Sequence, residues 1–308
     1  MNTSSAPGKI ILFGEHAVVY GRPALAVPVT QVQAVAEADA AARPGVWIEA
    51  PDIHLSSELS RLSPDHPLRA VIESVFNALG ISNHPALTVR ISSTIPVASG
   101  LGSGAAVSVA VIRALSAYLG YPLPEDQVSA LAYEVEKIHH GTPSGIDNTV
   151  ITYARPVYFI KGRPIETFHA GASFTLVIGD TGVSAPTKES VGDVRRRWET
   201  DKPRWERVFD EIGKIAGAAK ERIENGDWMA LGPLMDQNHA LLQELTVSSG
   251  DLDRLVDAAR RSGALGAKLS GGGRGGNMIA LVHPKQAEAV VQALRQAGAR
   301  HTIITTIS

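Results

Sequence analysis

The sequence predicts an α+β protein with two domains. Segments with the alternation typical of strands and segments with the apolar spacing of helices follow one another along all 308 residues. This pattern restarts near residue 174, after a hairpin-like stretch, which indicates a domain boundary near 169–174. A hydrophobic fraction of 44% with 19% charged residues is enough for packed cores. The expected domains are therefore 1–169 and 170–308.

Composition excludes several classes of function. The net charge is −2, from 29 Lys and Arg against 31 Asp and Glu, whereas nucleic-acid binders usually carry a basic excess. The absence of cysteine excludes disulfides, thiolate catalysis and cysteine metal sites. The N-terminus lacks the basic and apolar regions of a signal peptide, and no apolar run approaches the roughly 18 residues of a membrane span. We therefore expect a cytoplasmic protein that binds neither nucleic acid nor membrane.

Alternation of apolar and polar residues predicts the strands of the first half. Apolar residues spaced by three or four predict its helices, which end at glycines. The expected elements, in order, are a strand, a tight turn and a second extended piece over 8–20, strands over 27–35 and 46–50, a helix over 67–80, a strand over 86–95, helices over 105–120 and 124–141, a turn at Pro143 and Gly145, and a hairpin over 156–168.

The second half begins with a buried strand and then becomes strongly helical. Proline interrupts a long charged helical pattern, and a glycine-rich loop separates two apolar strands. The expected elements are a strand over 174–182, a helix over 189–226 broken near Pro203, helices over 227–245 and 251–263, a strand, glycine loop and strand over 267–282, a helix over 288–298 and a closing strand over 301–308.

A glycine-rich loop, IPVASGLGSGAAV over 95–107, lies between a predicted strand and a predicted helix. Glycines allow positive φ and a close approach of backbone N–H groups to a ligand. The start of the helix adds unpaired N–H donors and the positive end of its dipole, which favours anions. The hydroxyls of Ser99 and Ser103 can reach phosphate oxygens or a metal ion. The alternative is an ordinary flexible connection between strand and helix.

Known phosphate-binding motifs do not describe this loop. No Gly-Lys-Ser/Thr occurs, which excludes a Walker loop, and the protein-kinase signatures are absent. A dinucleotide fingerprint fits formally at 100–105 but lacks the acidic strand end expected about 20 residues later. A second formal match, at 271–276, leads into a strand instead of a helix. The loop is therefore expected to hold phosphates by its own geometry, with a second glycine loop in the other half.

Four segments carry a family resemblance: PGKIILFGEHAVVYGRPALA, IPVASGLGSGAAVSV, HGTPSGIDN and KLSGGGRGGNMIAL, in this order. The chain resembles the GHMP small-molecule kinases, and within them the mevalonate kinase family. The resemblance implies a ribosomal S5 domain 2-like N-terminal domain and a ferredoxin-like C-terminal domain. It implies ATP-dependent phosphorylation of (R)-mevalonate at the 5-hydroxyl, with Mg²⁺ as cofactor and a homodimer as the assembly.

Two other functions stay open from the sequence. One is a related kinase acting on phosphomevalonate, on the 3-hydroxyl of mevalonate, on a sugar or on homoserine. The other is a nucleotide-binding regulator without catalytic activity.

The resemblance assigns catalytic roles to Asp147 and Lys9. Asp147, in GTPSGIDN, is the expected base for the alcohol, and its alternative is a turn or helix cap after Gly145. Lys9 is expected to keep that carboxylate ionised and to neutralise the transferring phosphoryl group. Its alternative is a solvated residue at a strand edge.

Substrate binding is expected at Glu15 and His16, in the turn after Gly14, where the histidine can donate to substrate oxygens. The alternative is an ordinary surface turn. Thr187 resembles a threonine that contacts the mevalonate carboxylate, and its alternative is a helix cap.

The nucleotide and metal ligands are expected mainly in the glycine loops. Glu136 aligns with a Mg²⁺ ligand, although Glu134, Glu136 and Lys137 would ordinarily form a solvated helix face; Ser103 is the second expected ligand. His139 and His140 are read as structural. The expected nucleotide-binding residues are Pro96, Ser99, Gly100, Leu101, Gly102, Ser103, Gly104, Ala105, Gly272 and Gly273.

Three residues depart from the family pattern. Gly104 stands where most relatives have a second serine. Arg274 interrupts the second glycine loop, where its side chain can reach a phosphate or leave toward solvent. Asn277 replaces a residue that is often small.

Overall fold

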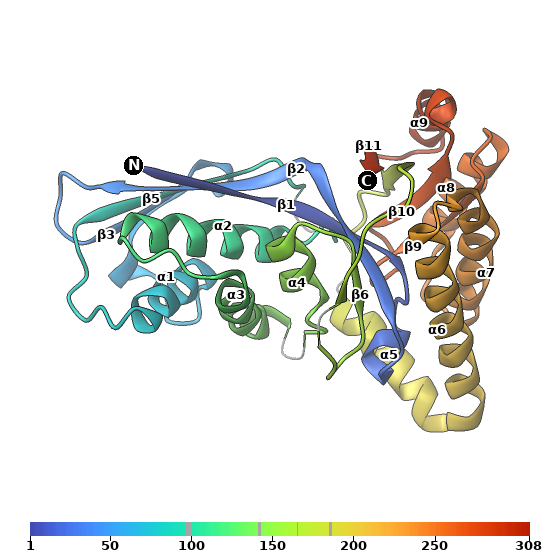
Figure 1. Ribbon diagram of the computed structural model, residues 1–308, viewed down its shortest axis with the longest axis horizontal. Helices are drawn as coiled ribbons and strands as arrows, with labels where there is room; N and C mark the ends of the chain where they lie inside the picture. The colour runs from blue at the N-terminus through green and yellow to red at the C-terminus, as the bar shows by residue number, and fades with distance from the viewer. Residues whose placement is uncertain (97–99, 141–142, 165, 185–186) are drawn as a thin grey trace. The chain divides into compact units, whose positions relative to one another are not determined.

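The computed structural model describes residues 1–96, 100–140, 143–164, 166–184 and 187–308, without the side chains of 139, 140, 187 and 188 (Figure 1). The chain forms two compact units that interleave in sequence. Unit 1 comprises Met1–Gly8, Val32–Val97 and Leu101–Ala154, and unit 2 comprises Lys9–Gln31, Ala98–Gly100 and Arg155–Ser308. This partition differs from the expected domains 1–169 and 170–308, which stay a prediction.

Two long paired strands, β1 (Asn2–Phe13) and β2 (Ala24–Ala40), contribute residues to both units. In unit 1, the strand order is β4-β3-β5-β2, with β3 and β5 parallel and the other pairs antiparallel. The remaining strands of this unit are β3 (Val46–Ala50), β4 (Leu55–Glu58) and β5 (Leu87–Ser93). Alternating burial in β3 matches a sheet with one face packed on a core.

The helices of unit 1 pack on one another, and α2 packs on β5. They are α1 (Pro67–Ala78), α2 (Ser103–Tyr118), α3 (Glu125–His140) and α4 (Ile146–Tyr153), with 3₁₀ turns at Pro51–Ile53 and Leu59–Arg61. In α1 the buried residues follow the three- and four-residue spacing that predicted this helix: Leu68, Val71, Ile72, Val75 and Phe76.

In unit 2, the first residues of β2 pair with β6 (Val157–Phe159), which pairs with β7 (Glu166–Thr167). A separate antiparallel sheet has the order β11-β8-β10-β9. Its strands are β8 (Phe174–Asp180), β9 (Gly266–Ser270), β10 (Asn277–Val282) and β11 (His301–Ile307). All residues of β8, β9 and β10 are buried, which matches the apolar runs within β8 and β10.

Helices of unit 2 cover this second sheet: α7 and α8 contact β9, and α9 contacts β8 and β11. The helical elements are α5 (Thr187–Thr200), α6 (Lys202–Glu224), α7 (Leu231–Glu244), α8 (Gly250–Arg261) and α9 (Ala287–Gln296), with 3₁₀ turns at Ala17–Tyr20, Trp228–Ala230 and Pro284–Gln286. The break between α5 and α6 lies where Pro203 predicted it. Asp201 caps α6 by accepting a hydrogen bond from the N–H of Arg204 at 3.2 Å.

Some local predictions were wrong. The second extended piece within 8–20 is a 3₁₀ helix, because the turn at Gly14 and His16 adopts positive φ and winds the next four residues. Strand β4 and helix α4 were missed, since each is short. The other expected strands and helices are confirmed, with ends shifted by a few residues.

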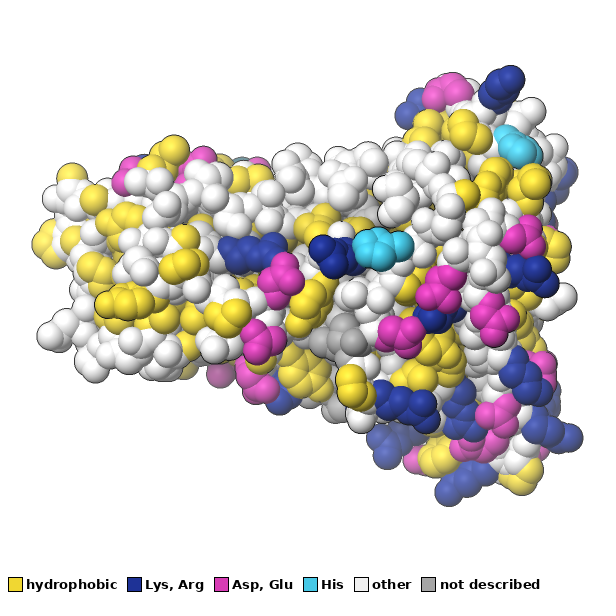
Figure 2. All heavy atoms as spheres, viewed as in Figure 1, with side chains coloured by type: hydrophobic (Ala, Val, Ile, Leu, Met, Phe, Trp, Pro, Cys, Tyr) yellow, Lys and Arg dark blue, Asp and Glu magenta, His cyan; other side chains and the backbone are white. Residues whose placement is uncertain are grey.

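Acidic and basic side chains intermingle over the region of α5 and α6 in Figure 2. Many of them form ion pairs between successive turns, such as Arg195 with Glu199 and Lys214 with Glu211. The described residues include no helix with the length and apolar character needed to cross a membrane.

Candidate active site

The turn at Gly14 is built so that only glycine fits. Gly14 has φ +93°, and a Cβ at this position would lie 2.4 Å from both the Cα of Ala24 and the carbonyl oxygen of Pro23. This contact holds the end of β1 against the start of β2. The next two residues, Glu15 and His16, are 1% and 5% exposed, so the surface-turn alternative is wrong.

Glu15 forms a buried ion pair with Lys268 of β9. The Lys268 ammonium donates to Oε1 of Glu15 and, at 2.6 Å, to the carbonyl oxygen of Leu269, and both charged side chains have no exposure. Burial raises the pKa of Glu15, while the Lys268 charge and the backbone at Glu15 and Gly271 oppose that rise. Burial lowers the pKa of Lys268, and Glu15 opposes the change. The pair fixes the orientation of the turn.

His16 is held in one orientation by the second glycine loop. Its Nε2 lies 3.1 Å from the carbonyl oxygen of Gly272, and since a carbonyl can only accept, Nε2 carries the proton. Burial lowers the pKa of His16 to about 4, so the ring is neutral near pH 7 and Nδ1 is an acceptor. Nδ1 is buried and has no hydrogen-bond partner among the described residues. The neutral ring can therefore accept a hydrogen bond from a hydroxyl at Nδ1, and its expected role as a donor to substrate oxygens stays a prediction.

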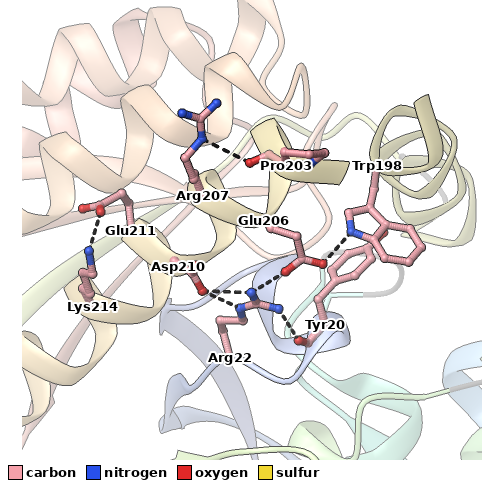
Figure 3. Close-up of polar contacts among 9 residues, drawn as sticks. All are labelled: Tyr20, Arg22, Trp198, Pro203, Glu206, Arg207, Asp210, Glu211 and Lys214. Carbon is pink, nitrogen blue, oxygen red and sulfur yellow. Dashed lines mark hydrogen bonds and ion pairs between the residues drawn. The ribbon is translucent and has the colours of Figure 1, made fainter. Parts of the chain in front are cut away.

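The 3₁₀ turn after His16 is anchored to α5 and α6 by the cluster drawn in Figure 3. Arg22 pairs with Glu206 and, at 2.8 Å, with Asp210, while the indole N–H of Trp198 donates to Glu206 at 2.7 Å. The ring of Tyr20 stacks on Phe209 with centroids 4.2 Å apart. Sequence reasoning missed this cluster, whose partners lie far apart in the chain.

The second glycine loop, residues 271–276, passes between two neighbouring backbone segments. A Cβ at Gly273 would lie 1.9 Å from the carbonyl oxygen of Val247, and one at Gly275 would lie 2.4 Å from that of Val183. The N–H groups of Arg274 and Gly276 donate to these same carbonyls, at 2.7 and 2.9 Å. Glycine is therefore required on each side of Arg274.

In unit 1, Asp147 lies in the first turn of α4, half-buried, after Gly145 at φ +89°. Thr149 donates to the carbonyl oxygen of Gly145 at 2.6 Å, and the amide of Asn148 donates to the hydroxyl of Ser129 on α3 at 2.9 Å. These bonds fix the start of α4 on α3 and so position Asp147. No sequence motif indicates either bond.

The first glycine loop leads into α2 with glycines in left-handed conformations, Gly100 at φ +78° and Gly102 at φ +75°. The N-cap residue of α2 is Gly102, which has no side chain to accept hydrogen bonds from the first N–H groups of the helix. A Cβ placed on Gly100 would lie 3.7 Å from the Nδ2 of Asn277, at the end of the second loop. Ser99 lies outside the described residues.

The expected metal ligands, Glu136 and Ser103, both belong to unit 1. Glu136 is 7% exposed, which rules out the solvated-face alternative for this residue, while Glu134 and Lys137 are exposed. A carboxylate with a hydroxyl fits Mg²⁺, which usually takes one or two carboxylates together with phosphates and water. Within the described part of the chain, no group of three or more His, Cys, Asp or Glu could hold a metal by itself. A Cβ at Gly104 would meet nothing within 4 Å, so space does not exclude a serine there.

The structure brings Glu15, His16 and the second glycine loop together within unit 2. Lys9 is also in unit 2 and is 5% exposed, so it is not a solvated edge residue. Asp147 is in unit 1, and its pairing with Lys9 stays a prediction. Thr187 begins α5, but its side chain lies outside the described residues, as do those of His139 and His140.

Two family models match the chain: GHMP kinases N terminal domain over residues 66–155 and GHMP kinases C terminal over residues 219–300. A mevalonate kinase of Pyrococcus abyssi is 38% identical, covering 99% of this chain and 95% of the relative. One of Pyrococcus furiosus is 39% identical, covering 99% and 96%. The chain belongs to the mevalonate kinase family of GHMP kinases. The predicted resemblance is thereby confirmed.

Solved structures of this family confirm the two-domain GHMP kinase fold. The mevalonate kinase of L. major in complex with R-mevalonate matches with a TM-score of 0.86 and 29% identity, over 100% of this chain and 96% of that one. The Methanococcus jannaschii mevalonate kinase matches with a TM-score of 0.83 and 28% identity, over 99% and 96%. Nearly the whole chain therefore follows the family fold.

Two buried histidines are expected to make the stability of this kinase sensitive to mild acid. Burial lowers the pKa of both His16 and His239 to about 4; His239 accepts from the N–H of Leu269 at 3.3 Å. The unfolded imidazoles have a pKa near 6.5, so below that pH the unfolded state binds more protons. We expect the contribution of each ring to stability to be complete above about pH 6.5 and to be lost as the pH falls to about 4, by up to roughly 3 kcal/mol for each ring.

Urea unfolding at a series of pH values measures this loss. His239→Gln should reduce the slope between pH 6.5 and 4, whereas His301→Gln, at an exposed position, should leave it unchanged. A free energy of unfolding that stays constant over this interval in the native protein would contradict the prediction.

Proposed function

We propose that this chain transfers the γ-phosphoryl group of ATP to the 5-hydroxyl of (R)-mevalonate, giving 5-phosphomevalonate for isoprenoid synthesis. The observation that carries this proposal is the near-full-length similarity to proteins named mevalonate kinase, at 38–39% identity for the archaeal relatives cited above. The mevalonate-bound relative of the same fold supports the choice of acceptor. We expect the enzyme in the cytoplasm, as a homodimer.

Asp147 and Lys9 are the proposed catalytic pair. The 5-hydroxyl oxygen of mevalonate attacks the γ-phosphorus of ATP while Asp147 accepts the hydroxyl proton. The bond between the γ-phosphorus and the β–γ bridging oxygen breaks, and ADP leaves. Lys9 keeps the carboxylate ionised and neutralises charge that spreads over the phosphoryl oxygens. Phosphoryl transfer depends mainly on such positioning and charge neutralisation.

Glu15 and His16 are proposed to bind the acceptor, with Thr187 contacting its carboxylate. The buried pair of Glu15 with Lys268 keeps the turn fixed, which limits the entropy lost when the acceptor binds. Nδ1 of His16, which is buried and has no hydrogen-bond partner among the described residues, would accept a hydrogen bond from a hydroxyl of mevalonate.

ATP is proposed to bind along the two glycine loops, with its phosphates at the start of α2. Glu136 and Ser103 would hold Mg²⁺, which neutralises phosphate charge when it is bound. The loop residues Gly272 and Gly273 would face the nucleotide from the second loop. The missing second serine at Gly104 leaves a ligand position for water.

Phosphorylation of another alcohol is the remaining alternative. A phosphomevalonate kinase of Streptococcus pneumoniae and a galactokinase of Lactococcus lactis share the fold with TM-scores of 0.82 and 0.77, but each is 18% identical. That similarity supports the fold alone, so no observation favours these acceptors.

A coupled ADP-release assay over a panel of alcohols tests the proposed function. The panel holds mevalonate, phosphomevalonate, galactose and homoserine, each with ATP and Mg²⁺. Mevalonate should give the highest kcat/KM, and phosphorus NMR of the product should place the phosphate on the 5-oxygen. Turnover restricted to another alcohol, or phosphate on the 3-oxygen, would reject the proposal.

A further inference from the structure

Arg274 occupies a backbone position that suits glycine. Its φ is +63°, in the left-handed region that disfavours residues with a Cβ, and its neighbours Gly273 and Gly275 have no room for a side chain. Arg274 is therefore a strained residue, and it is the one residue of the loop 271–276 that has a side chain. A strained residue beside a binding loop points to a function for its side chain.

The Arg274 side chain reaches α5, where Nη1 pairs with Oδ2 of Asp193; Asp193 also pairs with Arg196. Arg274 remains 33% exposed. The described residues offer no hydrogen-bond partner to its Nε or Nη2. Asp193 thus holds the guanidinium at Nη1, while the N–H groups on Nε and Nη2 can donate to an anion. A guanidinium is planar and can donate two parallel hydrogen bonds to the two oxygens of a carboxylate.

This cation lies close to the turn that is proposed to bind the acceptor. The carbonyl of Gly272, two residues before Arg274, accepts the proton of His16 Nε2. The charge of Arg274 contributes to the lowered pKa of His16, after the larger effect of burial. His16 is neutral and Lys268 is paired with Glu15, so neither supplies a free positive charge to an acceptor.

Open space adjoins Asp193, the partner of Arg274. A hollow of about 520 Å³ is lined by Glu189, Gly192, Asp193 and Arg196. It is large enough for a small hydroxy acid. Glu189 is exposed, so water screens its repulsion of an anion.

We propose that Arg274 binds the carboxylate of the acceptor through the guanidinium N–H groups that Asp193 leaves available. Asp193 is the positioning residue that orients the guanidinium. The enzyme thereby selects a hydroxy acid over a neutral alcohol of the same shape. This inference rests on the proposed function, because it concerns the acceptor of that reaction.

The test compares mevalonate with 3-methylpentane-1,3,5-triol, in which a hydroxymethyl group replaces the carboxylate. Calorimetry gives Kd for both compounds, and turnover gives KM for mevalonate and for ATP. In Arg274→Gly the preference for mevalonate over the triol should fall by about 10- to 100-fold, the range of one charged hydrogen bond. KM for ATP should stay unchanged.

The folding of Arg274→Gly and the behaviour of three further variants separate this role from a structural one. Arg274→Gly relieves the positive φ, so it should fold at least as well as the native chain. Arg274→Lys keeps the charge and should retain part of the preference, and Asp193→Asn should raise KM for mevalonate with little change in kcat. Arg195→Gln, which removes an exposed arginine of α5 paired with Glu199, is the matched control and should keep the full preference.

An unchanged preference in Arg274→Gly overturns the inference, as does a raised KM for ATP with unaltered mevalonate binding, which would assign Arg274 to a nucleotide phosphate. If the native protein binds mevalonate without phosphorylating it, the proposed function fails while the Kd ratios still decide the role of Arg274. Failure to bind mevalonate rejects both.

Discussion

Asp147→Asn is expected to lower kcat for mevalonate phosphorylation by about 10²- to 10⁴-fold, the usual contribution of a general base. Asparagine has the same shape but cannot take the proton of the attacking hydroxyl. KM for ATP should change little, because the proposed nucleotide contacts lie in the glycine loops. Steady-state kinetics with mevalonate and Mg-ATP measures this loss.

The fold should tolerate this substitution. Asn is accepted in the first turn of a helix, and the bonds that fix α4 come from Thr149 and from Asn148 to Ser129. Asp126→Asn, an exposed carboxylate in the first turn of α3, is the matched control and should retain full kcat. A kcat within threefold of the native value for Asp147→Asn would assign that residue to helix capping alone.

Sequence patterns were sufficient for the parts of the site that depend on local backbone geometry. Glycine spacing predicted both loops, and the structure places Gly100 and Gly273 at the positive φ that such loops require. The three- and four-residue spacing of apolar residues predicted α1, and apolar runs predicted the buried strands β8 and β10. Both signals are local, because the burial of a segment determines which of its own residues are apolar.

Contacts between distant segments could not be predicted in this way. Lys268 looks like an ordinary polar residue in KLSGGG, yet its partner Glu15 lies 253 residues earlier. The proton position on His16 depends on the carbonyl of Gly272, which no motif encodes. Helix α4 was missed because its eight residues follow a proline and glycine turn and hold too few apolar repeats for a periodic signal.

The buried ion pair of Glu15 and Lys268 should produce the largest change in stability. Lys268→Met leaves the Glu15 carboxylate buried without its cation, and removing one partner of a buried pair typically costs about 3–5 kcal/mol. Without the ammonium, only the backbone hydrogen bonds at Glu15 and Gly271 oppose the effect of burial, so the pKa of Glu15 rises further and protonation relieves part of the loss at lower pH. Denaturant unfolding at two pH values measures both effects.

The double variant Glu15→Gln with Lys268→Met distinguishes a lost charge balance from a lost packing contact. It removes both charges, so it should recover much of the stability that Lys268→Met loses, because no uncompensated charge remains in the core. Lys214→Met, which breaks an exposed pair with Glu211, should leave stability unchanged. Equal losses in the single and double variants would mean that the Lys268 side chain stabilises the core by packing, and that its charge does not hold the substrate-binding turn in place.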